Sequence, residues 1–143
     1  MIDEVKYKKT LLAIIVPKSH KGTGIEFLTP NRFSQQLAYM HHPKGKIIFP
    51  HVHNPVFRSM KKTLEVLYIR KGKVRIDFYA SKRVYAESRV LVKGDVVMLV
   101  NGGHGFTMLG DVEMIEIKQG PYTGRDGDKT RFTPIAERKI RIK

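Results

Sequence analysis

Short apolar runs, each ended by glycine, proline or asparagine, make up most of this chain. The runs are rich in valine, isoleucine, tyrosine and phenylalanine, which are enriched in β-strands. No long stretch keeps a helical period, although one helical turn fits around residues 32–37. The pattern predicts an all-β protein with strands at Leu11–Val16, Gly24–Leu28, Gln36–His41, Lys46–Phe49, Leu64–Arg70, Lys73–Tyr79, Arg89–Val92, Asp95–Val100, Gly105–Leu109 and Val112–Gln119.

Glycines mark the turns between the strongest of these runs. Gly72 separates Leu64–Arg70 from Lys73–Tyr79, which predicts a hairpin with Gly72 at a positive φ angle. Gly94 and Gly110 likewise predict turns, each just before the next apolar run. Many short strands joined by such turns indicate a sandwich or a closed barrel, and closure would remove exposed strand edges.

The chain has the length of one domain. Its 143 residues are enough to bury a core without covalent cross-links. We expect a single domain over 1–143, with N-terminal strands or an arm at 1–34, a barrel core at about 36–119 and a basic extension at 120–143. The extension is polar and rich in turn-forming residues, so we expect it to be solvated or bound by a partner.

The N-terminal segment Met1–Pro17 contains the longest apolar run, Leu11–Val16. This run is far shorter than the roughly 20 residues needed to cross a bilayer, so no membrane association is expected. Asp3 and Glu4 interrupt the basic start, and no small-residue cleavage site follows, in contrast to a signal peptide. We interpret the segment as an N-terminal strand, which could pair with the sheet of a second copy in a homodimer.

Composition narrows the possible chemistry. The chain contains no cysteine, which excludes disulfides, thiolate metal sites and cysteine nucleophiles and suits a reducing cytoplasm. The net charge is +14, and such a charge gathered on one surface would attract nucleic acid or phosphorylated molecules. The basic residues are instead spread along the whole chain without a nucleic-acid-binding motif, so nucleic acid is the least favoured partner.

His51 and His53 are the first candidate for chemistry. One residue separates them, so on a strand both side chains project from the same face. Neutral imidazoles bind divalent ions at roughly 2.0–2.1 Å, and a pair on one face can chelate such an ion. The pair alone is a weak signal, because two histidines also commonly line a polar surface.

The surroundings of this pair resemble the two sequence motifs of the cupin superfamily. The first motif is matched by Gly45, His51, His53, Glu65 and Gly72, and the second begins at Gly94 and delivers a histidine after Asn101-Gly102-Gly103. The resemblance implies a double-stranded β-helix, or jelly-roll, barrel that holds one divalent transition metal, which would be Fe, Mn, Ni or Zn. The implied metal ligands are His51, His53, Glu65 and His104.

Two features depart from the cupin pattern. Eleven residues separate His53 from Glu65, many more than in the usual motif, and we expect them to form a long loop at the barrel mouth. In the second motif, Val100 stands where proline is usual and His104 comes one residue early. The glycines before His104 would absorb this shift, and His42 is the reserve candidate for the third histidine.

A narrower resemblance covers roughly residues 45–130. The tract Glu116-Ile117-Lys118-Gln119-Gly120-Pro121-Tyr122, a later Asp128-Lys129, and His53-Asn54-Pro55 resemble the WbuC-like cupins. That family is associated with bacterial surface-polysaccharide gene clusters. The resemblance therefore implies a carbohydrate or a sugar phosphate as the small-molecule ligand.

Strand alternation suggests which other residues surround the site. Glu65 shares its face with aliphatic residues, and Phe106 and Met108 follow His104 on the inward face as pocket-lining residues. Basic side chains of the long loop suit an anionic substrate: Arg58, Lys61 and Lys62. The weaker acid–base candidates are Glu116, Lys118 and Tyr122, with Asp77 and Tyr79 after them. If Ile115 and Ile117 point inward, however, Glu116 and Lys118 are an ordinary surface pair.

Three functions fit these patterns. The first is a metalloenzyme for a small anionic, sugar-like molecule, with the metal acting as a Lewis acid in isomerisation or epimerisation or as a redox centre for oxygen chemistry. The second is a non-catalytic sensor or carrier that uses the metal as an anchor. The third is a basic protein associated with nucleic acid, whose affinity would fall steeply with salt. Fold alone does not choose between them, because such barrels support many functions.

Overall fold

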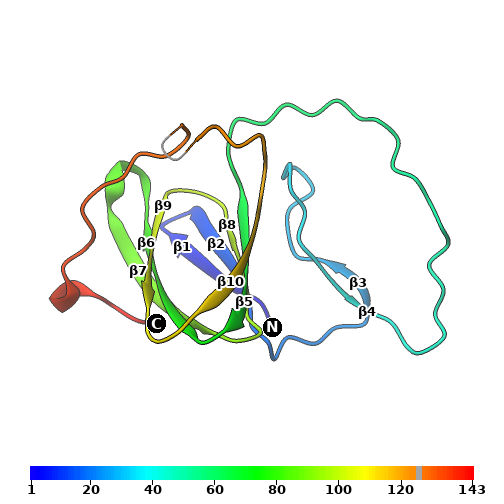
Figure 1. Ribbon diagram of the computed structural model, residues 1–143, viewed down its shortest axis with the longest axis horizontal. Helices are drawn as coiled ribbons and strands as arrows, with labels where there is room; N and C mark the ends of the chain where they lie inside the picture. Colours follow the sequence, from blue (N-terminus) through cyan, green and yellow to red (C-terminus); the bar gives the residue numbers. More distant parts are fainter. Residues whose placement is uncertain (125–126) are drawn as a thin grey trace.

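The computed structural model describes residues 1–124 and 127–143 and confirms the all-β prediction. A five-stranded sheet of order β1-β2-β8-β5-β10 faces a three-stranded sheet of order β7-β6-β9, and the hairpin β3-β4 lies beside them (Figure 1). The strands are β1 (Asp3–Tyr7), β2 (Thr10–Val16), β3 (Gly24–Phe27), β4 (Ala38–His41), β5 (Glu65–Lys71), β6 (Lys73–Tyr79), β7 (Tyr85–Val92), β8 (Val96–Leu99), β9 (Gly103–Met108) and β10 (Glu113–Lys118). In the part of the chain described, β9 and β10 end their sheets, so the strands form a sandwich and not a closed barrel.

The core fills the space between the two sheets. Leu67 and Ile69 of β5 and Ile76 and Phe78 of β6 are buried there together with residues of β2, β7 and β8. Glu65 is buried on the same face of β5, whereas Tyr68 on the other face is partly exposed. The predicted alternation along β5 is therefore confirmed, and it brings a carboxylate to the edge of an apolar core.

The turn at Gly72 differs from the predicted hairpin. Gly72 has the expected positive φ of 80°, but β5 and β6 belong to different sheets, so the prediction of a hairpin is wrong. The chain turns a corner here, and a Cβ atom at Gly72 would lie 2.1 Å from the carbonyl oxygen of Asp111. Gly94 likewise lies between β7 of one sheet and β8 of the other. At each of these tight corners the chain passes from one sheet to the other.

The N-terminal segment forms two strands instead of the single strand expected. β1 and β2 pair antiparallel around a turn that contains Lys8 at a φ of 54°. β2 carries the apolar run and lies between β1 and β8, so both of its edges are already paired. The apolar run itself therefore has no free edge, whereas β1 of the same N-terminal segment ends the sheet in the described chain, so pairing of this segment with a second copy stays a prediction.

The chain between β4 and β5 has no described strand, so the prediction of a strand at Lys46–Phe49 is not met. The loop is longer than the expected 54–64 segment, since it begins directly after His41. Figure 1 shows it as a wide arc that passes around the β3-β4 hairpin before it returns to β5.

The C-terminal extension lies against the sandwich, which differs from the expected free or partner-bound tail. The hydroxyl oxygen of Tyr79 accepts a hydrogen bond from the backbone N–H of Ile135 at 2.9 Å. Further on, Ile142 forms a parallel bridge with Ser88 of β7. In the described residues no helix is long and apolar enough to cross a membrane, since both helices are three-residue 3₁₀ turns, Ser81–Arg83 and Glu137–Lys139.

Candidate functional site

A buried carboxylate and a histidine meet at one end of the sandwich. Glu65 begins β5 and is 6% exposed. His104 belongs to β9, where its backbone pairs with that of Phe78. The Oε2 atom of Glu65 and the Nε2 atom of His104 are 3.2 Å apart. Because β5 and β9 belong to different sheets, this contact joins the two layers.

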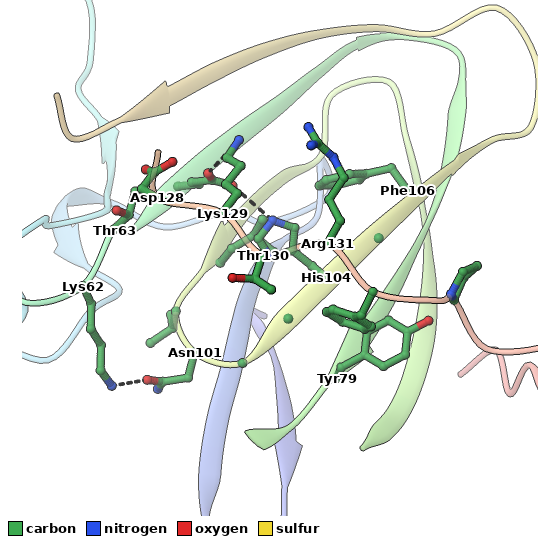
Figure 2. A pocket seen from close by; sticks show the side chains of 18 of the residues that line it. Lys62, Thr63, Tyr79, Asn101, His104, Phe106, Asp128, Lys129, Thr130 and Arg131 are labelled. Carbon is green, nitrogen blue, oxygen red and sulfur yellow. Dashed lines mark hydrogen bonds and ion pairs between the residues drawn. The ribbon is translucent and has the colours of Figure 1, made fainter. Parts of the chain in front are cut away.

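A cavity of about 940 Å³ opens beside this pair. Its walls come from the end of β6, from the segment between β8 and β9, and from the C-terminal chain that crosses the mouth (Figure 2). Its described lining is Lys61, Lys62, Thr63, Glu65, Tyr79, Leu99, Val100, Asn101, Gly102, Gly103, His104, Gly105, Phe106, Asp128, Lys129, Thr130, Arg131, Phe132 and Pro134. The site thus combines apolar walls with a small number of polar groups, as is typical of small-molecule pockets.

Basic side chains outnumber acidic ones around the cavity. Of the described lining residues, four are basic and two, Glu65 and Asp128, are acidic. Lys129 Nζ lies 3.9 Å from Glu65 Oε1. Lys62 Nζ donates a hydrogen bond to the side-chain oxygen of Asn101, whose own amide donates to the Leu11 carbonyl at 2.8 Å. This network ties the end of the long loop to the mouth of the cavity.

Two glycines at the mouth allow close approach of neighbouring segments: Gly102 admits β6, and Gly103 admits the C-terminal chain. Gly102 has a φ of 74°, and a Cβ atom there would lie 2.0 Å from the carbonyl oxygen of Tyr79. A Cβ atom at Gly103 would lie 2.8 Å from the ring of Phe132. The Phe132 ring in turn packs edge-on against Tyr79, with 5.0 Å between centroids. Of the two glycines expected to absorb a register shift, Gly103 therefore also makes room for the covering C-terminal chain.

The electrostatics of the site favour an ionised Glu65. The hydrogen bond from His104 lowers the pKa of the Glu65 carboxyl, burial opposes this shift, and the charges of His104, Lys129 and Lys118 add to it. For Lys118, partial removal from water lowers the pKa, but the nearby carboxylates, led by Glu116, raise it overall. A carboxylate and an ammonium group are therefore both charged near the cavity at neutral pH.

Glu65→Gln is expected to make folding less sensitive to acid. The folded-state pKa of Glu65 lies below its ordinary value of 4.5. The ionised carboxylate therefore contributes stability above that pH and loses it as the pH falls through the lowered pKa. Urea denaturation from neutral to acid pH should show that the difference in unfolding free energy between the native chain and the variant shrinks on acidification. A difference that stays constant with pH would contradict this assignment.

The structure divides the four predicted metal ligands into two pairs, of which only one lies at the cavity. Glu65 and His104 form one pair inside the cavity. His51 and His53 form the other, with their ring centroids 5.4 Å apart, but both are exposed on the long loop and neither lines the cavity. The Nδ1 atom of His51 lies 2.9 Å from the carbonyl oxygen of Phe49 in the same loop. No group of three or more His, Asp or Glu side chains comes together within residues 1–124 and 127–143.

The other predicted substrate-binding residues also separate. Lys61, Lys62 and Phe106 line the cavity, whereas Arg58 lines a second hollow of about 540 Å³ beside Phe27 and Phe33. Met108 lies outside the described lining.

The predicted acid–base candidates lie at or beyond the edge of the site. Ile115 and Ile117 are exposed on the outward face of β10, so they do not compete with Glu116 and Lys118 for the inner side. Lys118 Nζ is 4.0 Å from Glu116 Oε2, and neither residue is among the described lining residues. Tyr122 is 75% exposed.

Two further candidates have other roles. Asp77 is buried in a hydrogen-bond network with Arg75 and Ser88. Tyr79 lines the cavity and binds the C-terminal chain through its hydroxyl. The reserve ligand His42 does not line the cavity either.

Sequence reasoning missed the contribution of the C-terminal chain. Asp128, Lys129 and Arg131 line the cavity (Figure 2), and Phe132 lines it as well. The available signal was the presence of apolar residues in an otherwise polar extension, since isolated aromatic residues there need a surface to cover them.

Comparison with known proteins gives no relative from which a role could be transferred. No family model, no curated protein and no solved structure matches this chain.

Proposed function

We propose that this chain is a cupin-type protein that binds a divalent metal ion and a small anionic, sugar-like molecule in the cavity beside Glu65 and His104. The observation that carries the proposal is the buried Glu65–His104 contact at the wall of a cavity with an excess of basic groups. We favour a metalloenzyme of the isomerase, epimerase or oxygenase type. The WbuC-like tract of the sequence favours carbohydrate as the substrate class.

The path of the chain supports a jelly-roll relationship. Of the strands from β5 to β10, β5, β8 and β10 lie in the five-stranded sheet, and β6, β7 and β9 lie in the three-stranded sheet. The chain therefore crosses repeatedly from one sheet to the other. Such repeated crossing between two facing sheets is typical of jelly-roll folds. It also explains how Glu65 and His104, far apart in the sequence, become neighbours.

The Glu65–His104 pair fits two neighbouring ligand positions of one ion. Two donor atoms each about 2.1 Å from an ion are about 3.0 Å apart at a right angle and about 3.4 Å apart at a tetrahedral angle. The measured separation of 3.2 Å falls between these values. His51 and His53, which lie outside the cavity on the exposed long loop, would supply the remaining protein ligands once this loop docks at the cavity. When bound, a divalent ion would supply Lewis-acid or redox chemistry to the cavity.

The cavity also fits an anionic ligand. Its volume of about 940 Å³ lies within the range of about 300–1,000 Å³ common for small-molecule sites. Lys62 lines it from the end of the long loop and Lys129 from the C-terminal chain, and ammonium groups bind phosphate or carboxylate as compact charges. Phe106 and Phe132 provide apolar walls that exclude water and strengthen these interactions.

A non-catalytic sensor or carrier is the second candidate. The observation that favours it is that the predicted acid–base candidates Glu116, Lys118 and Tyr122 lie outside the described lining of the cavity. Beside the Glu65–His104 pair, the described lining groups that could move a proton are therefore those without a predicted catalytic role, such as Asp128, or with a structural one, such as Tyr79. An enzyme needs a proton donor or acceptor within hydrogen-bond reach of its substrate. A binding protein could use the same cavity without one, and turnover of a bound ligand distinguishes the two candidates.

Lys129→Ala is expected to weaken binding of a sugar phosphate by about tenfold or more, because one charge-assisted hydrogen bond contributes about 1.5–3 kcal/mol. Calorimetric titration of tag-free, metal-loaded protein with hexose phosphates, inorganic phosphate and the matching neutral hexoses measures the change. Lys71→Ala is the matched control, since Lys71 pairs with Asp111 at the corner beside Gly72. Equal losses in both variants, or no saturable binding by the native chain, would overturn the assignment of this cavity.

A further inference from the structure

The carboxylate of Glu65 has a different neighbour at each of its two oxygens. Its Oε2 atom lies 3.2 Å from Nε2 of His104, and its Oε1 atom lies 3.9 Å from Nζ of Lys129. The side chain of Glu65 is only 8% exposed, so water compensates little of its negative charge. The ammonium group of Lys129 therefore supplies positive charge to this buried carboxylate.

Lys129 is placed by the C-terminal chain that crosses the mouth of the cavity (Figure 2). Two contacts fix this chain just beyond it: the Phe132 ring packs against Tyr79, and the backbone N–H of Ile135 donates to the Tyr79 hydroxyl. The side chain of Lys129 itself is 45% exposed. The chain therefore holds Lys129 near Glu65, while the ammonium group has room to turn from the carboxylate to another anion in the cavity.

The proposed metal site and this ion pair use the same carboxylate. An ion bound by Glu65 and His104 would lie close to the Lys129 ammonium group, since both contact one carboxyl group. Two positive charges at short range repel each other, and more strongly where apolar walls exclude water. A tethered ammonium group also competes at a high effective concentration, because it cannot diffuse away. Metal binding therefore works against the Lys129–Glu65 contact.

A second ammonium group, that of Lys118, also acts on Glu65 but has a carboxylate of its own. Its Nζ atom lies 4.0 Å from Oε2 of Glu116. The pKa of the Glu65 carboxyl is lowered most by the hydrogen bond from His104 and, between the two lysines, more by Lys129 than by Lys118. Of these two lysines, Lys129 is therefore the one whose removal should affect the carboxylate more.

We propose that Lys129 is a built-in competitor of the metal ion at Glu65, and that an anionic ligand relieves this competition by binding the Lys129 ammonium group. The inference rests on the proposed function and adds a means of regulation to that site. Metal and anion then bind cooperatively. Because such coupling is reciprocal, each raises the affinity of the other by the same factor, which is typically about 5- to 150-fold.

Lys129→Gln distinguishes competition from a structural role, because it removes the charge and keeps a polar side chain. Loss of a structural residue would weaken the binding of metal and of anion alike. Competition predicts opposite effects, with weaker anion binding and tighter metal binding. We expect the affinity for Ni²⁺ to rise about fivefold or more, since an ion pair with a partly exposed partner contributes up to about that factor.

Competition titration against a chelating dye measures the Ni²⁺ affinity of tag-free protein, with and without a hexose 6-phosphate. Two controls should bind Ni²⁺ like the native chain: Lys129→Arg keeps the positive charge, and Lys71→Ala removes a charge that pairs with Asp111 instead. The hexose 6-phosphate should tighten Ni²⁺ binding by the native chain but not by Lys129→Gln. The matching neutral hexose should change neither affinity.

The possible results separate this inference from the proposed function. If the native chain binds Ni²⁺ and Lys129→Gln binds it equally or more weakly, the competition is overturned and the metal site stands. Tighter binding by Lys129→Gln, without any effect of hexose 6-phosphate on the native chain, would retain the competition and refute the role of the anion. Absence of Ni²⁺ binding by both chains would refute the proposed function and this inference with it.

Discussion

Arg75→Ala is expected to lower the free energy of unfolding by about 3–5 kcal/mol, because it leaves a buried carboxylate without its partner. Arg75 donates to Asp77 Oδ1 from Nε at 2.9 Å and to both carboxylate oxygens of Glu137 at 2.7 and 2.8 Å. Ser88 Oγ also donates to Asp77 at 2.5 Å. Asp77 and Ser88 are buried on the outer side of β6 and β7, where the C-terminal chain crosses.

Urea denaturation measures this loss of unfolding free energy, and two further variants serve as references for its size. Arg70→Ala removes an arginine whose side chain is 67% exposed and 3.4 Å from Glu113, so it should cost only about 0–1 kcal/mol. Replacing Arg75 and Asp77 together by Met and Leu should recover much of the stability, because neither buried charge of this pair then remains. If Arg75→Ala cost no more than Arg70→Ala, the network would not hold the C-terminal chain as described.

His104→Ala is expected to weaken divalent-metal binding by at least about 100-fold, since loss of even an outer partner of a metal ligand typically costs about 10–100-fold. Competition titrations of metal-free protein with Zn²⁺, Ni²⁺, Mn²⁺ and Fe²⁺ measure the affinity. His41→Ala is the matched control, because His41 is exposed on β4 and its imidazole contacts the Gly22 carbonyl. Native-like affinity in His104→Ala would remove this residue from the site.

The strands were predictable where local sequence determines them. The run Lys73–Tyr79 is confirmed residue for residue as β6, because its β-branched and aromatic residues lie between a glycine and a turn. The role of Gly72 was predicted only in part. A positive φ follows from the residue type, whereas the sheet that each flanking strand joins depends on partners far away in the sequence, such as β8 for β5 and β9 for β6.

The candidate site was predictable to a similar degree. Glu65 and His104 were selected by motif spacing, and the structure places them 3.2 Å apart. Lys129 was missed because its approach to Glu65 depends on the path of the C-terminal chain across the mouth, which no local pattern describes. His51 and His53 were selected by the same motif, but the structure places them on the exposed long loop outside the cavity, and the path of so long a loop is not determined by local sequence.

Elemental analysis of tag-free protein is the most direct test of the central claim, that Glu65 and His104 form part of a divalent-metal site. The native chain, purified without metal-affinity steps, is compared with Glu65→Ala and His104→Ala. The proposal predicts close to one equivalent of Fe, Mn, Ni or Zn per native chain and a large loss in both variants. A native chain that stays metal-free after incubation with all four ions, or variants that keep the full equivalent, would contradict it.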